Sequence, residues 1–162
     1  MVQTKTTSLI LLFTCGSGQP SMKITHFPNQ DVDTIYYKIK DYLEGCAKYT
    51  YGRFTAQDIK NNIKNNSHQQ LWIAHKEDKI YGFVVTQPTQ YPQKKVLDMV
   101  FTGGIELELW KEDMLKTIQG FAKSTGCEAI ESQGRKGWGK VFKEDGFESR
   151  FMFYELPVEE IV

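Results

Sequence analysis

Two carboxylates stand inside segments that otherwise read as apolar β-strands. Asp98 interrupts the segment 96–101, and Glu131 lies late in the segment 127–132. Desolvation in an apolar sheet raises the pKa of a carboxyl group toward neutral, which suits a general base that takes a proton from a nucleophile. Structural carboxylates shift in the same way. Each residue is therefore a candidate base, with a rim residue bonded to a neighbour as the alternative.

Two glycine-containing stretches lie between a strand-like and a helix-like segment, where unpaired backbone N–H groups can bind phosphate. The first is Gly103-Gly104. Four carboxylates follow it and would place negative charge where a phosphate would bind, namely Glu106, Glu108, Glu112 and Asp113. Carboxylates near a helix N-terminus also stabilise the helix, so simple capping is the alternative.

The second stretch, residues 134–139, reads Gly-Arg-Lys-Gly-Trp-Gly. It matches the Gly-x-x-Gly-x-Gly spacing of a phosphate loop and adds two cations, although such a match is weak by itself. Arg135 and Lys136 can contact phosphates or an anionic substrate. The alternative is a solvated basic loop.

Cysteine and histidine residues have no spacing typical of a metal site or of a nucleophile–base pair. The three cysteines are too few and too scattered for a disulfide framework, and they fit a reducing compartment. We therefore expect no metal site, and we predict a cytoplasmic protein.

The overall composition indicates a single globular domain. The chain has 162 residues with 20 basic and 20 acidic side chains, so no net charge favours nucleic acid or an anionic membrane as a partner. The N-terminal apolar run, 9–13, is far shorter than the roughly 20 residues of a membrane span. We expect residues 1–21 to be a tail and residues 22–162 to be the domain. The alternative is a secretory or lipid-anchoring segment.

The elements that must position these residues follow from periodicity. Helical spacing of apolar residues predicts helices over 31–46 and 107–122, and Thr55-Ala-Gln-Asp58 is a capping-box pattern that begins another. A short helix is predicted over 136–143. Strands are predicted over 22–27, 71–74, 80–86, 96–101, 127–132 and 147–156.

Pro88 and Pro92 predict a loop, because proline cannot donate to a central ladder. The resulting order is β-α-α-β-β-β-α-β-α-β. It predicts an α/β (α+β) fold in which helices flank a mixed sheet of about six strands.

This element order, with a short helix that ends in Gly146-Phe147, resembles the GNAT superfamily of N-acyltransferases. In that family the strand resembling 96–101 diverges from the parallel strand resembling 127–132. The resemblance implies that the pantetheine arm of an acyl-CoA pairs with backbone in the gap, here at Met99, Val100 and Phe101. It places the pyrophosphate at the start of the next helix, near Gly103 and Gly104, with Arg135 as a further contact.

The chain departs from the family pattern at two places. The family's phosphate loop, Gln/Arg-x-x-Gly-x-Gly/Ala, has no match after Gly104. Phe142 stands where the family often has a tyrosine that protonates the departing thiolate, and phenylalanine cannot donate a proton. Tyr154 and Tyr81 are alternative donors that nothing in the sequence ties to the site.

The resemblance implies an acyl-CoA-dependent N-acyltransferase that uses acetyl-CoA, with an amine on an unknown small molecule or protein as acceptor. The departures favour, as the alternative, a non-catalytic GNAT-like binding or structural protein. A looser likeness to GNAT-like proteins of tailed bacteriophages rests on Leu71-Trp72, on residues 131–138 and on Gly146-Phe147. In that case the host cytoplasm is the expected location. An exposed aromatic surface would then mark the partner, with Tyr36, Tyr37, Tyr49 and Tyr51 as candidates.

Overall fold

The structure is a computed structural model that describes residues 21–159. The chain divides into two compact units, one ending at Ser132 and one beginning at Gln133. The predicted tail, residues 1–21, lies almost wholly outside the described residues. A single domain over 22–162 stays a prediction.

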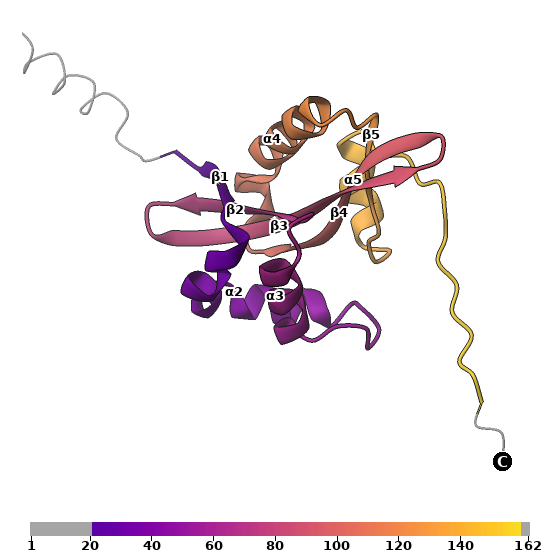
Figure 1. The fold of residues 1–162 in the computed structure, drawn as a ribbon, viewed down its shortest axis with the longest axis horizontal. Coiled ribbons are helices and arrows are strands. Elements are labelled where there is room, and N and C mark those ends of the chain that lie inside the picture. Colours follow the sequence, from indigo (N-terminus) through magenta and orange to yellow (C-terminus); the bar gives the residue numbers. More distant parts are fainter. Residues whose placement is uncertain (1–20, 160–162) are drawn as a thin grey trace, which may run out of the picture. The chain divides into compact units, whose positions relative to one another are not determined.

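The first unit is built on a five-stranded sheet with the order β1-β2-β3-β4-β5 (Figure 1). The strands are β1 (Lys23–Phe27), β2 (Gln70–Lys76), β3 (Lys79–Tyr91), β4 (Lys94–Gly104) and β5 (Ala129–Ser132). Neighbouring strands are antiparallel except β4 and β5, which are parallel. The mixed sheet predicted from the element order is therefore confirmed.

Three α-helices flank this sheet, with α2 (Val32–Ala47) and α3 (Ala56–Asn65) on one face and α4 (Lys111–Ser124) on the other (Figure 1). Short 3-10 helices, η1 (Asn29–Asp31) and η2 (Leu107–Leu109), precede α2 and α4. The predicted capping box forms at α3, where the Thr55 hydroxyl accepts from the Asp58 N–H and Asp58 accepts from the Thr55 N–H. Asp31 occupies the N-cap of α2 without a side-chain capping bond.

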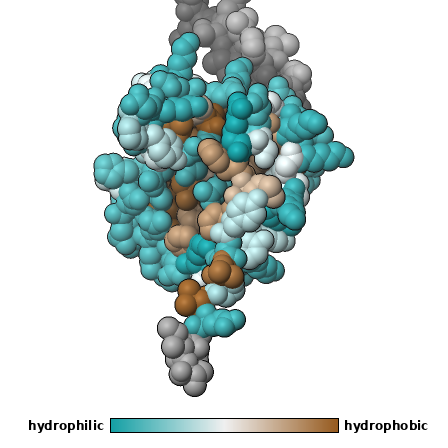
Figure 2. Space-filling model, turned by 90° about the vertical axis from the view of Figure 1, so that its right-hand side faces the viewer, coloured by the Kyte–Doolittle hydropathy of each residue, from teal (hydrophilic) through white to brown (hydrophobic). Residues whose placement is uncertain are grey.

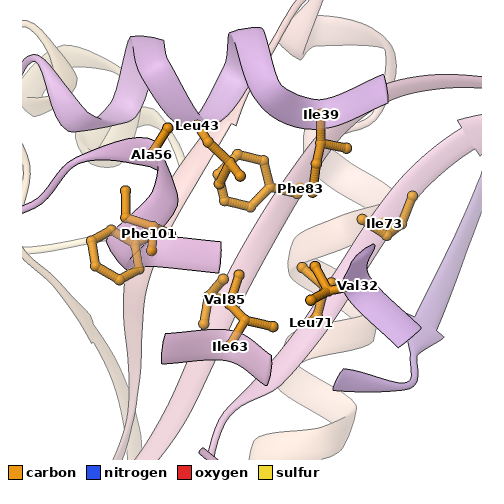
Figure 3. Packing of buried hydrophobic residues seen from close by; sticks show 11 residues of the cluster. Val32, Ile39, Leu43, Ala56, Ile63, Leu71, Ile73, Phe83, Val85 and Phe101 are labelled. Atoms are coloured by element: carbon orange, nitrogen blue, oxygen red, sulfur yellow. The ribbon is translucent and has the colours of Figure 1, made fainter. Parts of the chain in front are cut away.

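The hydrophobic core lies between the sheet and the two helices α2 and α3. Figure 3 shows Ile39 and Leu43 of α2 packed over Phe83 of β3, and Ile63 of α3 packed beside Val85. These residues are the apolar faces of the predicted helices and the inward residues of the strands. On the opposite face, Trp110, Met114 and Ile118 are buried.

The predicted loop at Pro88 is wrong. Pro88 lies inside β3, where it is the register partner of Leu97 on β4. The pairing of β3 with β2 ends at Thr86, so at Pro88 the only described strand that pairs with β3 is β4. A proline is tolerated there because a strand edge needs no N–H donor. Pro92 does lie in the turn between β3 and β4.

The second unit contains one helix, α5 (Trp138–Glu144), in its described residues. The rings of Trp138, Phe142 and Phe147 pack in series, with centroid separations of 5.5 and 4.9 Å. Gly146 has a φ of +85°, and the Phe147 N–H bonds to the Phe142 carbonyl, which is the glycine-terminated helix end that Gly146-Phe147 predicts.

The predicted last strand, 147–156, is wrong, and it accounts for the difference between about six predicted strands and five. Residues 147–159 form no strand, and strand-forming composition is not enough without a neighbour to complete the ladder. Side chains from Phe151 to Val158 are largely exposed. Figure 2 shows hydrophobic groups next to the grey C-terminal end.

No helix within residues 21–159 has both the length and the apolar character needed to cross a membrane.

Candidate active site

The two predicted carboxylates are brought together by the parallel pairing of β4 with β5. Asp98 is the register partner of Glu131. Register partners on adjacent strands project from the same face of a sheet, so the two carboxyl groups are neighbours. The face is that of the core under α2 and α3, because Asp98 also pairs with Gln87, two residues along β3 from the core residue Val85.

The environment of Asp98 shifts its acidity in the direction predicted. Partial burial, and then the charge of Glu131, raise the pKa of Asp98 to about 6. Desolvation raises the free energy of the ionised carboxylate, and the like charge of Glu131 raises it further. Asp98 thus holds a carboxyl group that changes protonation near neutral pH.

Tyr91, at the end of β3, ties Glu131 in place. Its hydroxyl donates to Glu131 Oε1 at 2.8 Å, and this bond raises the pKa of Tyr91 above its usual value. The two residues are far apart in sequence, and no local pattern predicted the contact. Tyr91 reaches Glu131 because β3 is long and a tight hairpin joins it to β4, which pairs with β5.

Strands β4 and β5 pair only over a short stretch and then part. The pairing runs from Val96–Ala129 to Met99–Ser132, while β4 continues to Gly104 with β3 as its only partner among the described strands. Ser132 Oγ donates to the Met99 carbonyl at 3.3 Å, at the point where the strands part. Beyond that point no described strand pairs with the outer edge of β4.

Val100 is a β-bulge on β4 at this divergence. Val85 pairs with Phe101 and Thr86 pairs with Met99, which leaves Val100 without a partner on β3. Of the three predicted pantetheine contacts, Met99 and Phe101 have buried side chains and Val100 is half-buried. Any contact with a ligand at Met99 or Phe101 would use backbone atoms.

The open half of β4 also meets helix α2. The Thr102 backbone N–H donates to the Cys46 thiol, and burial raises the pKa of that thiol. A raised pKa keeps Cys46 protonated and poorly nucleophilic. The structure therefore gives Cys46 a packing role on β4.

Gly103 and Gly104, the predicted phosphate contacts, are required by close packing. A Cβ atom on Gly103 would lie 2.9 Å from the Tyr42 carbonyl oxygen, and one on Gly104 would lie 2.3 Å from the Tyr81 carbonyl oxygen. Gly104 also has a φ of +145°. Packing alone explains both glycines, and their predicted contact with phosphate stays a prediction.

The start of α4 differs from a phosphate site in charge. Glu112 and Asp113 lie exposed in its first turn, and Glu106 and Glu108 lie exposed just before it. Trp110 occupies the N-cap position, is buried, and donates from its indole to the Ile105 carbonyl at 2.8 Å. This segment is held by a buried indole and carries negative charge, so it does not fit a pyrophosphate group.

Arg135 lies exposed in the second unit, before α5. A Cβ atom on Gly134 would approach Phe142 and Trp138 to 3.1 Å, so local packing accounts for this glycine. Phe142, which replaces the family's tyrosine, packs between two aromatic rings of its own unit. Within residues 21–159, no group of three or more His, Cys, Asp or Glu side chains could hold a metal ion.

No protein-family model matches this sequence, and no curated protein matches it. Solved structures do match. An aminoglycoside N-acetyltransferase in complex with CoA has a TM-score of 0.62 at 15% identity, over 86% of this chain and 97% of that one. The ribosomal-protein-alanine N-acetyltransferase of Brucella melitensis has a TM-score of 0.66 at 9% identity, over 85% and 100%. A GNAT family acetyltransferase of Staphylococcus aureus has a TM-score of 0.59 at 16% identity, over 85% and 99%.

This protein has a mixed α+β architecture in which helices flank a mixed sheet. More particularly, its fold is that of the GNAT acetyltransferases, as the element order predicted. At these identities the likeness concerns the fold, and function must be argued from the site. A transcriptional regulator from Bacillus halodurans C-125 matches equally well, with a TM-score of 0.61 at 16% identity.

Proposed function

We propose that this protein is an acyl-CoA-dependent N-acyltransferase that transfers an acetyl group to an amine. The observation that carries the proposal is the Asp98–Glu131 pair at the point where β4 and β5 part. It combines a carboxyl group of raised pKa with an open strand edge on a GNAT fold.

In the proposed reaction, Asp98 takes the proton from the acceptor's ammonium or from its amine during attack. A base with a pKa near 6 is largely ionised near neutral pH and still accepts a proton readily. Glu131, held by Tyr91, stays beside it and attracts the cationic acceptor. The thioester supplies the acyl carbon and a leaving thiolate, so a C–N bond forms as the C–S bond breaks.

The residues fit the two ends of CoA unequally. The edge of β4 from Val100 to Gly104 pairs with no described strand, and apart from the Thr102 N–H, which bonds to Cys46, its backbone groups suit the amides of a pantetheine arm. The acidic start of α4 does not suit the pyrophosphate. We therefore expect weak acyl-CoA binding, held mainly at the strand edge.

Calorimetric titration of the full chain with acetyl-CoA and with CoA tests this proposal. Saturable heats, and acetyl transfer to a primary amine that Asp98→Asn abolishes, are the expected results. Absence of heat up to millimolar cofactor would overturn the proposal.

A second candidate function is a non-catalytic binding protein, favoured by exposed aromatic side chains. Tyr37 and Tyr51 are 74% and 76% exposed, and Phe151 and Tyr154 are 93% and 81% exposed. Large exposed aromatic side chains, taken in each unit by itself, are typical of partner surfaces. A structural component encoded by a bacteriophage is one form of this candidate. It predicts stable complexes with another protein and no binding of CoA.

A further inference from the structure

A threonine hydroxyl and a histidine ring are in contact at the opposite side of the sheet from Asp98 and Glu131. Thr25 lies on β1, which with β5 forms the two outer strands of the described sheet, and His75 lies on the neighbouring β2 (Figure 1). Thr25 Oγ1 is 2.7 Å from His75 Nε2. The contact pairs a hydroxyl that can act as a nucleophile with a ring that can act as a base.

The second nitrogen of the ring determines which partner holds the shared proton. His75 Nδ1 lies 3.4 Å from the backbone carbonyl oxygen of Glu77. A carbonyl oxygen only accepts, so the proton of this bond belongs to Nδ1. A neutral imidazole carries one N–H proton, which leaves Nε2 with a free electron pair. The Thr25 hydroxyl therefore donates to Nε2, which is the arrangement in which a base activates a hydroxyl.

The backbone of the hairpin between β2 and β3 holds the ring in this position. Glu77 has a φ of +53°, a left-handed conformation that is uncommon for a residue with a side chain, and its carbonyl reaches the ring. The Asp78 carbonyl accepts from Lys38 Nζ at 3.0 Å, which ties the turn to α2. The register of β2 with β3 shifts between Ala74 and His75, a β-bulge of the kind that redirects side chains. Strained backbone and bulges of this kind cluster at functional sites.

The pair is accessible to a ligand, although it lies beside the core. Thr25 is exposed and His75 is half-buried, whereas Ile73, the register partner of Thr25, is 3% exposed. Lys23 is the register partner of His75 and projects from the same face, so its ammonium group lies within reach of an acyl group on Thr25. A cation there stabilises the negative charge that develops on an acyl oxygen during attack.

The surroundings of the ring restrict the chemistry to reactive acyl donors. Among the described residues, His75 Nδ1 bonds to a carbonyl oxygen and not to a carboxylate. The imidazolium that forms on proton transfer is therefore stabilised less than in a hydrolase triad. The leaving group must depart as a stable anion, as the phenolate of an aryl ester does.

We propose that Thr25 is the nucleophile of a second reactive site, which accepts an acyl group from an activated ester with His75 as its general base. A bond forms between Thr25 Oγ1 and the acyl carbon as the bond from that carbon to the leaving oxygen breaks. His75 Nε2 takes the hydroxyl proton and passes it to the departing oxygen, so the products are an ester on Thr25 and a free phenol. The site stands apart from the proposed N-acyltransferase activity and needs no CoA.

Incubation of the full chain with 4-nitrophenyl acetate tests the site, with peptide fragment spectra to locate the acetyl groups. Thr34 is an internal control, because it is also exposed but its hydroxyl donates to the Asp31 carbonyl, which cannot take a proton. We expect Thr25 to be acetylated at least about a hundredfold faster than Thr34, since a positioned general base contributes roughly 10²–10⁴-fold. Equal rates at the two threonines would overturn the proposal.

Variants at the two positions distinguish a base from a structural hydrogen bond. His75→Gln keeps an acceptor for the hydroxyl but removes the base, so acetylation of Thr25 should slow by at least about tenfold. Thr25→Ser keeps the hydroxyl and should keep the reaction, whereas Thr25→Val should lose it and still show acetylated surface lysines. An unchanged rate in His75→Gln, or a serine at this position that does not react, would contradict the assignment.

Discussion

Asp98 and Glu131 face each other across the only parallel pair of strands in the described sheet. Only Glu131 of the two accepts a hydrogen bond from the described residues, and its donor is Tyr91 on the neighbouring hairpin. The asymmetry gives two identical functional groups different surroundings. Glu131 is held as a fixed charge, and Asp98 is left with a raised pKa and an open bonding position.

Replacement of Asp98 should stabilise the protein near neutral pH. Its pKa is 3.8 in the reference state and about 6 in the fold, so between these values the folded protein binds more protons than the unfolded chain. The free energy of unfolding therefore falls as pH rises through this window. We expect Asp98→Asn to raise stability near pH 7 by on the order of 1 kcal/mol, after allowance for partial exposure, and to have little effect near pH 3.

Urea unfolding at several pH values measures this effect. Asp78→Asn, in the exposed turn between β2 and β3, is the control and should show no such dependence on pH. A variant of Asp98 that is less stable than the parent near pH 7 would contradict the burial argument.

Removal of the charge at Glu131 should lower the pKa of Asp98. Burial is the larger cause of the raised value and the charge of Glu131 is the smaller, so Glu131→Gln should give a value below about 6 and still above 3.8. Carboxyl ¹³C chemical shifts followed against pH would report it. An unchanged pKa would mean that the two carboxyl groups do not interact.

A methyl group at Gly82 should be poorly tolerated. Its Cβ would lie 2.3 Å from the Trp110 ring, a position that neither the buried indole nor the paired strand can vacate easily. We expect Gly82→Ala to lower the free energy of unfolding by about 1–3 kcal/mol. Gly120→Ala in α4, where nothing lies within 4 Å, should instead stabilise by about 0.5–1 kcal/mol, because alanine favours a helix over glycine.

The midpoints of thermal unfolding of Gly82→Ala and Gly120→Ala test whether the Trp110 ring leaves no room for a methyl group at Gly82. Equal stabilities would show that Trp110 can shift to accept the methyl group.

The acidic first turn of α4 should weaken CoA binding if the pyrophosphate lies there. Glu112 and Asp113 are both exposed in that turn, and a carboxylate near a helix N-terminus is worth about 0.3–1 kcal/mol. We expect Glu112→Gln combined with Asp113→Asn to tighten CoA binding by roughly three- to tenfold. Glu128→Gln, beyond the C-terminal end of α4, should leave the affinity unchanged. If the double variant and Glu128→Gln bind CoA with equal affinity, the phosphates do not lie at the first turn of α4.

Much of the fold follows from local patterns in the chain. The spacing of Ile39 and Leu43 marks the buried face of α2, and the Thr55–Asp58 box begins α3 as predicted. These features depend on residues a few positions apart, where helical geometry alone decides which side chains meet. The same holds for Asp98 and Glu131 as carboxylates inside apolar strands.

Other features depend on which strands become neighbours, and no local pattern decides that. The segment 147–156 has the composition of a strand and forms none, whereas Pro88 lies within a strand that has already lost its β2 partner. Gly103 and Gly104 read as phosphate-loop glycines, but their surroundings require them for packing. Strand pairing and side-chain packing are made by residues remote in sequence, so only the folded chain settles them.

The candidate site also combines residues that the sequence predicts with residues that only the fold reveals. Its carboxylates could be named from the chain, because a charged residue in an apolar strand is a local anomaly. Tyr91 and Gln87 could not, because each is an ordinary polar residue until sheet register sets it beside Asp98 or Glu131. Register aligns strands from distant parts of the chain, and that alignment brings separate polar residues together on the sheet.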